Sequence, residues 1–362
     1  MIFKKNGGIL TFKSIRIKYV LLSLIVFTVS ILLIFNKVSN RTSTSRSSSS
    51  NGEWIVVTVT KSDNKSELWM IDTKDQRKQK LVSDRYPMIT GKVNAAGDIL
   101  IYSDAIGNNP WDIFKLNIPA NETYQITDDP LGQFNLHFGG EEENIVLAKS
   151  GGKISPVPQI SIVDINGKNG RTIELDPDIA VQDFDVRDNK IIALTFSFEE
   201  FIKKKFKEND NSTKISYSII EMDMDGSNKK VVSEIKAVSV DSISFSKSKD
   251  FIILGGAGIH DNEQGFYKLD INKNKIENLL TEEQVKKTNE VSQISQPFIA
   301  ALSSDEKNIY FAAIPIGTSE KNISGITVYP NALYCYNFDK MEISKVFEIP
   351  DGFIPSISFT YK

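Results

Sequence analysis

From residue 53 onward, short apolar runs alternate with polar turns, and no sustained helical spacing appears. Two such runs, Val240–Phe245 and Phe251–Leu254, are separated by the charged turn Ser246–Asp250. An amphipathic helix would instead repeat its apolar residues every three or four positions. Brief β-rich runs bounded by turn residues are typical of strands. The pattern therefore predicts an all-β fold over residues 53–362.

One strand pattern recurs six times, as an apolar run that ends in Asp or Asn. The copies are Leu68–Asp72, Ile113–Asn117, Ile160–Asp164, Ile219–Asp223, Phe266–Asp270 and Leu333–Asn337. Their final residues lie 45, 47, 59, 47 and 67 positions apart. A polar turn and another strand follow each copy, and a two-strand unit precedes it. Six repeats of four strands predict a six-bladed β-propeller.

The two ends of this region complete each other. Trp54–Val59 has the pattern of a second strand without a first, and Ile354–Thr360 that of a first strand without a second. Together they supply one full blade, and a ring closed in this way leaves no unpaired strand edge.

These units resemble the TolB-type, WD40-like propeller repeat. The matching segments are Leu68–Asp72 with Lys80–Val82, Ile113–Asn117 with Gln125–Thr127, and Ser218–Gly226. The first turn of the family pattern is matched only by Ser303–Lys307 and Ala95–Asp98. The resemblance covers residues 53–362 and implies the fold more than an activity, since such propellers bind proteins, form scaffolds or cap hydrolases.

The N-terminal region has a different composition. Tyr19–Phe35 contains 17 residues without a charge, enough for a helix of roughly 26 Å. We expect a transmembrane helix over residues 19–36, after a short basic cytoplasmic segment at 1–18. A cleaved signal peptide is the alternative, but no small-residue cleavage site and no lipid-accepting cysteine follow the run.

Flanking charges predict the orientation of this helix. Five basic residues precede the apolar run and three follow it, which favours a cytoplasmic N-terminus and an extracytoplasmic propeller. Residues 37–52 are rich in serine and should form a flexible linker with a reach of about 20 Å. The sequence thus predicts a single-pass protein of the cell membrane.

Charge also limits the choice of partner. Residues 51–362 retain 35 of the 43 basic residues but all 46 acidic ones, which leaves a net charge of −11. An acidic surface repels phosphate backbones, so we expect no nucleic-acid partner. Protein or peptide partners remain, and no cofactor is indicated.

The long insertions all fall between the second and third strands of a repeat or between repeats. They are Glu199–Lys214, Pro315–Asn331 and Thr281–Gln296. Long loops on a rigid scaffold usually carry recognition, so this face, away from the membrane, is the predicted binding face. The side chains expected to contribute to it are Trp111, Phe201, Lys204, Phe206 and Tyr329.

Catalytic and metal-binding patterns are weak in this sequence. Asp223–Asn228 begins like a calcium loop but fits an ordinary hairpin turn better, and Cys335 fits a small buried core residue. Asp183 and Asp185 alternate on one strand and could line the central channel, although solvated strand ends are the favoured interpretation.

We therefore expect a non-catalytic protein-binding or scaffold module of a bacterial cell envelope. Two alternatives stay open: a metal-dependent hydrolase or lactonase that uses carboxylates in the central channel, and a sensor of extracellular ligands.

Overall fold

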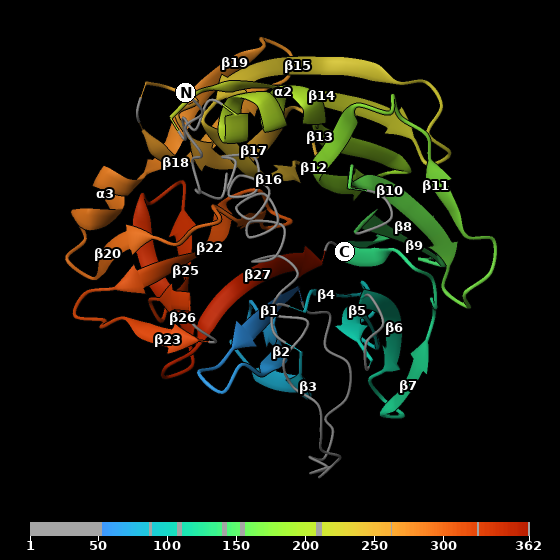
Figure 1. Ribbon diagram of the computed structural model, residues 1–362. Helices are drawn as coiled ribbons and strands as arrows, with labels where there is room; N and C mark the ends of the chain where they lie inside the picture. Colours follow the sequence, from blue (N-terminus) through green and yellow to red (C-terminus); the bar gives the residue numbers. More distant parts are fainter. Residues whose placement is uncertain are drawn as a thin grey trace, which may run out of the picture.

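The computed structural model describes residues 53–360 apart from 87–88, 107–110, 140–142, 153–155, 208–211, 262 and 324–325. Antiparallel sheets surround a central axis as six blades, as predicted from the repeats (Figure 1). Within each blade, the strand nearest the axis is called the inner strand, and the second, third and outer strands follow it outward. The predicted transmembrane helix at 19–36 and linker at 37–52 lie outside the described residues.

Blades 1 to 3 each contain four strands. Blade 1 consists of β27 (Phe353–Thr360), β1 (Trp54–Thr60), β2 (Ser66–Asp72) and β3 (Lys78–Arg85). Blade 2 consists of β4 (Gly91–Val93), β5 (Ile99–Ala105), β6 (Trp111–Asn117) and β7 (Glu122–Gln125). Blade 3 consists of β8 (Gly132–Gly139), β9 (Ile145–Gly151), β10 (Gln159–Asp164) and β11 (Arg171–Ile173).

Blades 4 and 5 follow the same plan, and blade 6 departs from it. Blade 4 consists of β12 (Ile179–Arg187), β13 (Lys190–Ser197), β14 (Ile215–Asp223) and β15 (Lys230–Ala237). Blade 5 consists of β16 (Ser239–Phe245), β17 (Phe251–Ala257), β18 (Gln264–Asp270) and β19 (Lys275–Thr281). Blade 6 consists of β20 (Val291–Ile294), β21 (Ala300–Leu302), β22 (Asn308–Pro315), β25 (Ala332–Asn337) and β26 (Glu342–Glu348).

Both ends of the described chain meet in blade 1, which confirms the predicted closure of the ring. The first strand β1 pairs antiparallel with the last strand β27, with Trp54 opposite Thr360 and Val57 opposite Ile357. The same strand pairs with β2 on its other side. Closure therefore rests on a continuous ladder of backbone hydrogen bonds between the two ends of the chain.

Apolar side chains fill the spaces between neighbouring blades. Because successive side chains of a strand point to opposite faces, Ile55 and Val57 of β1 face blade 6, whereas Val56 faces blade 2. Among the described residues, six clusters of buried apolar side chains occupy the six blade boundaries in this way. The core is thus a ring of inter-blade contacts and not a single centre.

The inner strand of blade 6 is split, although the sequence pattern predicts one strand over Phe298–Leu302. Only Ala300–Leu302 pairs with one half of β22, and β20 pairs with the other half. Phe298 instead bonds to blade 5, where its N–H donates to Asp241 and its carbonyl accepts from the Ser242 hydroxyl. A methyl group on Gly255 would lie 2.0 Å from that carbonyl oxygen, so only glycine permits this close approach.

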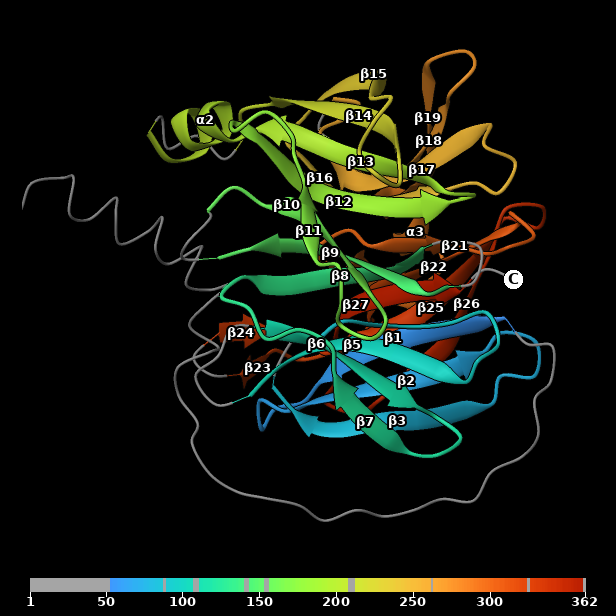
Figure 2. The same cartoon turned by 90° about the vertical axis from the view of Figure 1, so that its right-hand side faces the viewer.

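Two of the three insertions lie on one face of the ring. Helix α2 (Phe198–Phe201) and the π-helical turn η2 (Ile202–Lys207) follow β13, and the hairpin β23 (Lys321–Ile323) and β24 (Ile326–Val328) extends from blade 6. Figure 2 shows α2, β23 and β24 on one side of the ring and the C-terminal end of β27 on the other. Since Trp54 pairs with Thr360, β1 begins on the side opposite the insertions, as the sequence predicts.

The third insertion contains helix α3 (Glu282–Lys286). Its N-cap Thr281 accepts from the Gln284 N–H, and the Gln284 side chain accepts from the Thr281 N–H. This reciprocal pair is a capping box.

Closure of the propeller can be tested by removing one aromatic side chain of the closing strand, β27. Phe359 of β27 is 2% exposed and stacks on Tyr310 of blade 6, with ring centroids 5.9 Å apart. We expect Phe359→Ala to lower the free energy of unfolding by about 3–5 kcal/mol in urea denaturation. Met341→Ala, at a position that is 70% exposed, is the control and should change stability by less than about 0.5 kcal/mol. Equal effects of the two substitutions would contradict this role of β27.

Candidate functional site

A cavity of about 100 Å³ lies where the inner strands of the six blades meet, and β4, β8, β12, β16, β21 and β27 all contribute to its wall. The labels of β4, β8, β12, β16 and β27 surround the ring axis in Figure 1. The polar side chains that line the cavity and can carry charge or bind polar groups include Lys92, Asn135, His137, Asp183, Asp185 and Asp241.

Three of these side chains, from three consecutive blades, contact one another. Lys92 Nζ lies 3.1 Å from His137 Nδ1, and the same ring nitrogen lies 3.4 Å from Asp185 Oδ1. The imidazole ring packs against Phe184 with centroids 4.6 Å apart. Lys92 is 8% exposed and Asp185 is 3% exposed, so the cluster is largely shielded from bulk water.

Backbone and guanidinium groups fix Asp185 in place. Its Oδ2 accepts from the Phe245 N–H at 2.9 Å, and its Oδ1 accepts from the Val186 N–H at 2.9 Å. The Arg187 guanidinium lies 3.8 Å away and also donates to the Phe245 carbonyl. Burial would raise the pKa of Asp185, but Arg187, His137 and Lys92 outweigh it and hold the pKa well below its usual range. Asp185 is therefore a permanent carboxylate.

Burial shifts the two basic members of the cluster toward their neutral forms. It lowers the pKa of Lys92 to about 8, although Asp185 opposes the shift. Burial and the nearby Lys92 lower the pKa of His137 to about 4. At neutral pH the imidazole is uncharged and the amine is still mostly an ammonium, so the cluster holds one cation beside one anion.

A second level of polar groups lies two residues earlier along the same strand. Asp183 Oδ1 accepts from Asn135 Nδ2 at 3.0 Å, and Oδ2 accepts from the Ile243 N–H at 2.9 Å. Burial raises the pKa of Asp183 to about 6, against the effect of the Ile243 hydrogen bond. Burial also raises the pKa of Asp241, whose Oδ2 accepts from the Phe298 N–H.

The structure corrects the favoured interpretation of Asp183 and Asp185 as solvated strand ends. Both side chains line the cavity and bond to the backbone of the next blade. The strand continues to Arg187, so neither aspartate lies at its end.

The sequence patterns did not identify Lys92 or His137 as site residues. A single lysine between Gly91 and Val93, and a single histidine between Leu136 and Phe138, carry no spacing that points to chemistry. The only available signal was a polar residue on an otherwise apolar strand that faces the axis. Blade packing, not local sequence, brings these two side chains together.

The described residues contain no arranged set of metal ligands. Within the described parts of residues 53–360, no group of three or more His, Cys, Asp or Glu side chains could hold an ion. The turn Asp223–Asn228 joins β14 to β15, where Asp223 accepts from Asn228 Nδ2 and pairs with Lys190. Cys335 lies partly buried on β25, and burial raises the pKa of its thiol to about 11.

On the insertion face, two of the predicted binding residues have structural contacts. Phe201 packs against the core between blades 4 and 5, with its ring 5.2 Å from that of Phe196. Lys204 Nζ pairs with Glu200 at 2.6 Å and donates to the Lys214 carbonyl at 3.2 Å. Phe201 therefore holds the insertion to the scaffold, and Lys204 links two parts of the insertion itself.

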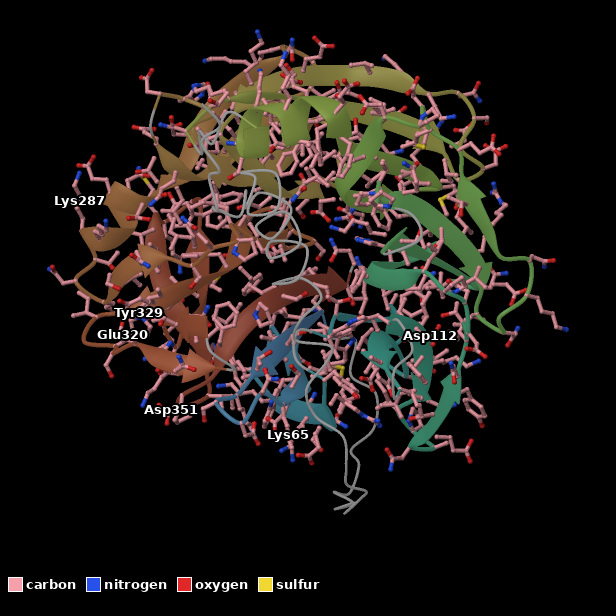
Figure 3. The ribbon with its side chains drawn as sticks, viewed as in Figure 1. Lys65, Asp112, Lys287, Glu320, Tyr329 and Asp351 are labelled. Carbon is pink, nitrogen blue, oxygen red and sulfur yellow. The ribbon has the colours of Figure 1, made fainter. Side chains whose placement is uncertain are left out.

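The other three predicted binding residues lie in different settings. Trp111 is only 4% exposed and packs on Phe134 in the core, so its ring does not reach the surface. The side chain of Phe206 lies outside the described residues. Tyr329 is 41% exposed, and its hydroxyl donates to Glu320 at 3.5 Å (Figure 3). The five residues thus do not form one described site.

Helices long and apolar enough to cross a membrane are absent from the described part of the chain. The predicted span at 19–36 precedes that part and stays a prediction.

Comparison with known proteins supports the fold. No family model and no curated protein sequence matches the chain. The solved structure of TolB from Acinetobacter baumannii matches with a TM-score of 0.59 and 12% identity, over 86% of this chain and 67% of that chain. A chain from a nidogen/laminin complex matches with 0.55 and 11%, over 85% and 98%.

A TolB structure from Agrobacterium tumefaciens matches with a TM-score of 0.53 and 7% identity, over 85% of this chain and 98% of that chain. At such identities the shared feature is the fold. The resemblance to TolB-type propellers is therefore confirmed for the architecture.

Protonation of His137 should destabilise the protein. Its pKa is about 4 in the folded chain and near 6.5 when unfolded, so the unfolded chain binds more protons between these values. The resulting stability is complete above about pH 6.5 and is lost as the pH falls toward 4. Relative to His137→Gln, the native protein should lose up to roughly 3 kcal/mol over this range in urea unfolding. A pH profile unchanged by the substitution would contradict a buried, neutral imidazole.

Proposed function

We propose that this chain is a membrane-anchored, extracytoplasmic propeller that acts as a non-catalytic protein-binding or scaffold module of the cell envelope. The observation that carries this proposal is the asymmetry of the ring. The insertions α2–η2 and β23–β24 occupy one face, whereas β1, which follows the predicted tether, begins on the other face (Figure 2). A protein anchored in this way presents its elaborated face outward.

Hydrogen bonds hold the described part of the insertion after β13 in place. Ser197 caps α2 by accepting from the Glu200 N–H, and its hydroxyl donates to Asp178 at 2.5 Å. Lys205 donates to the Thr213 carbonyl at 2.8 Å and so ties the two arms of the insertion together. Preorganised loops lose less entropy on binding, which favours recognition by this segment.

Exposed apolar groups lie on the insertion of blade 6. Ile316 is 56% exposed and Tyr329 is 41% exposed, and both belong to the connection between β22 and β25. Aromatic and aliphatic side chains of this kind are common anchors in protein interfaces. The similar fold in a nidogen/laminin complex supports a propeller of this size as a protein-binding surface.

The hydrogen bonds of the carboxylates in the central cavity support a non-catalytic function. Asp183, Asp185 and Asp241 each accept from a backbone N–H of the neighbouring blade. Their positions are accounted for by the joining of blades, without a reaction.

The insertion after β13 should be required for capture of a protein partner. We expect the fragment 51–362 to retain a partner from an envelope extract, and the same fragment with Glu199–Lys214 replaced by a short turn to lose it. The double variant Lys340→Met and Met341→Gln, in the turn between β25 and β26, is the matched control and should bind normally. Equal capture by all three proteins would place the site elsewhere.

The anchor can be tested separately. The full chain should sediment with membranes, and external protease should digest the propeller of intact spheroplasts. A chain without residues 19–36 should leave the membrane fraction. Protection of the full chain from external protease would overturn the proposed orientation.

A further inference from the structure

The central cavity has a charge arrangement that the joining of blades does not require. Lys92 supplies an ammonium group beside His137, at the level of Asp185 on the strand β12. Asp183 and Asn135 form a second polar level two residues earlier on that strand. Two residues of a strand span roughly 6.6 Å, so a cationic and an anionic wall face the same small space.

The cavity is too small for an extended ligand. It measures about 100 Å³, whereas an apolar cavity of about 150 Å³ holds benzene, a molecule of six heavy atoms. A ligand of about four to six heavy atoms fits this limit.

A ligand with a single charge suits the cavity poorly. An anion drawn to Lys92 would also meet Asp183, Asp185 and Asp241. A cation drawn to Asp183 would meet the charges of Lys92 and Lys149. A molecule with both charges, a few ångströms apart, pairs with each wall and brings no net charge into a buried site.

We propose that the central cavity binds a small zwitterion of the α-amino acid class, of the size of glycine or alanine. Its carboxylate accepts from Lys92 and its ammonium donates to Asp183 and to the amide oxygen of Asn135. His137 remains neutral and accepts from the Lys92 ammonium through Nδ1, which holds that group in position.

The protonation behaviour of the cavity agrees with this assignment. Burial is the largest cause of both the lowered pKa of Lys92 and the raised pKa of Asp183. Each charged form therefore lacks the solvation it would have in water, and an opposite charge on a ligand would stabilise it. Small-ligand binding here is independent of a protein partner on the insertion face.

Calorimetric titration of the full chain in mild detergent tests the proposal. Glycine and alanine should bind with one site per chain. Acetate and methylammonium, which carry one charge each, should bind at least roughly tenfold more weakly, and leucine should be excluded by its size. Glycine affinity should also fall between pH 7 and pH 9, as Lys92 loses its proton.

Three substitutions locate the site. Lys92→Met and Asp183→Asn should each weaken glycine binding by roughly tenfold or more, and Lys340→Met, in an exposed turn, should leave it unchanged. Circular dichroism and thermal unfolding show whether each variant folds. If either cavity variant fails to fold, the ligand series and the pH dependence of glycine affinity, both measured on the native chain, still test the proposal.

Several results would overturn the proposal. They are no binding of glycine at millimolar concentration, acetate or methylammonium binding as tightly as glycine, leucine binding equally well, or folded cavity variants that bind glycine normally.

Discussion

Side-chain contacts between neighbouring blades hold the ring together, because the backbone ladders of the described strands run within single blades. At the inner wall these contacts are polar and directional. Asp183 and Asp185 accept from N–H groups of blade 5, and Ser358 and Thr360 donate to carbonyls of blade 2 at 2.6 Å. Each such bond satisfies a backbone group on the inward edge of an inner strand, where no further strand can pair.

The same requirement explains why charge collects at the axis. Carboxylates are effective acceptors for buried N–H groups, but each adds a negative charge that burial disfavours. Arg187 and Lys92 offset part of this charge, and Lys149 donates to the Gln182 carbonyl nearby. The carboxylates of the cavity therefore follow from the way the ring is joined, whereas Lys92 adds a cation that this joining does not require.

The sequence was sufficient for the architecture because each blade is encoded locally. The six strands that end in Asp or Asn are recognised from residues close together in the chain. The pairing of Trp54–Thr60 with Phe353–Thr360 follows because these two strands complete one four-strand repeat. The face that carries the insertions also followed, since strand order alone assigns each loop to a face.

The side-chain environment could not be predicted in the same way. Phe201 lies in a long insertion, and Trp111 begins β6 after the connection from β5. Neighbouring blades pack over both side chains, so their burial depends on residues outside their own strands. Lys92, His137 and Asp185 are separated by 45 and 48 positions, and only the ring brings them into contact. Alternation on β12 indicated that Asp183 and Asp185 share a face but not that the face is enclosed.

Pairing of the first strand with the last also imposes an order in time. During synthesis β1 emerges early and finds β2 within a few residues, but its other neighbour, β27, is made after the strands of the other five blades. Until then one edge of β1 has no strand beside it, and the apolar surface facing blade 6 stays uncovered. The ring therefore stays open until β27 is made, and the pairing of β27 with β1 then covers both the open strand edge and the apolar surface that faces blade 6.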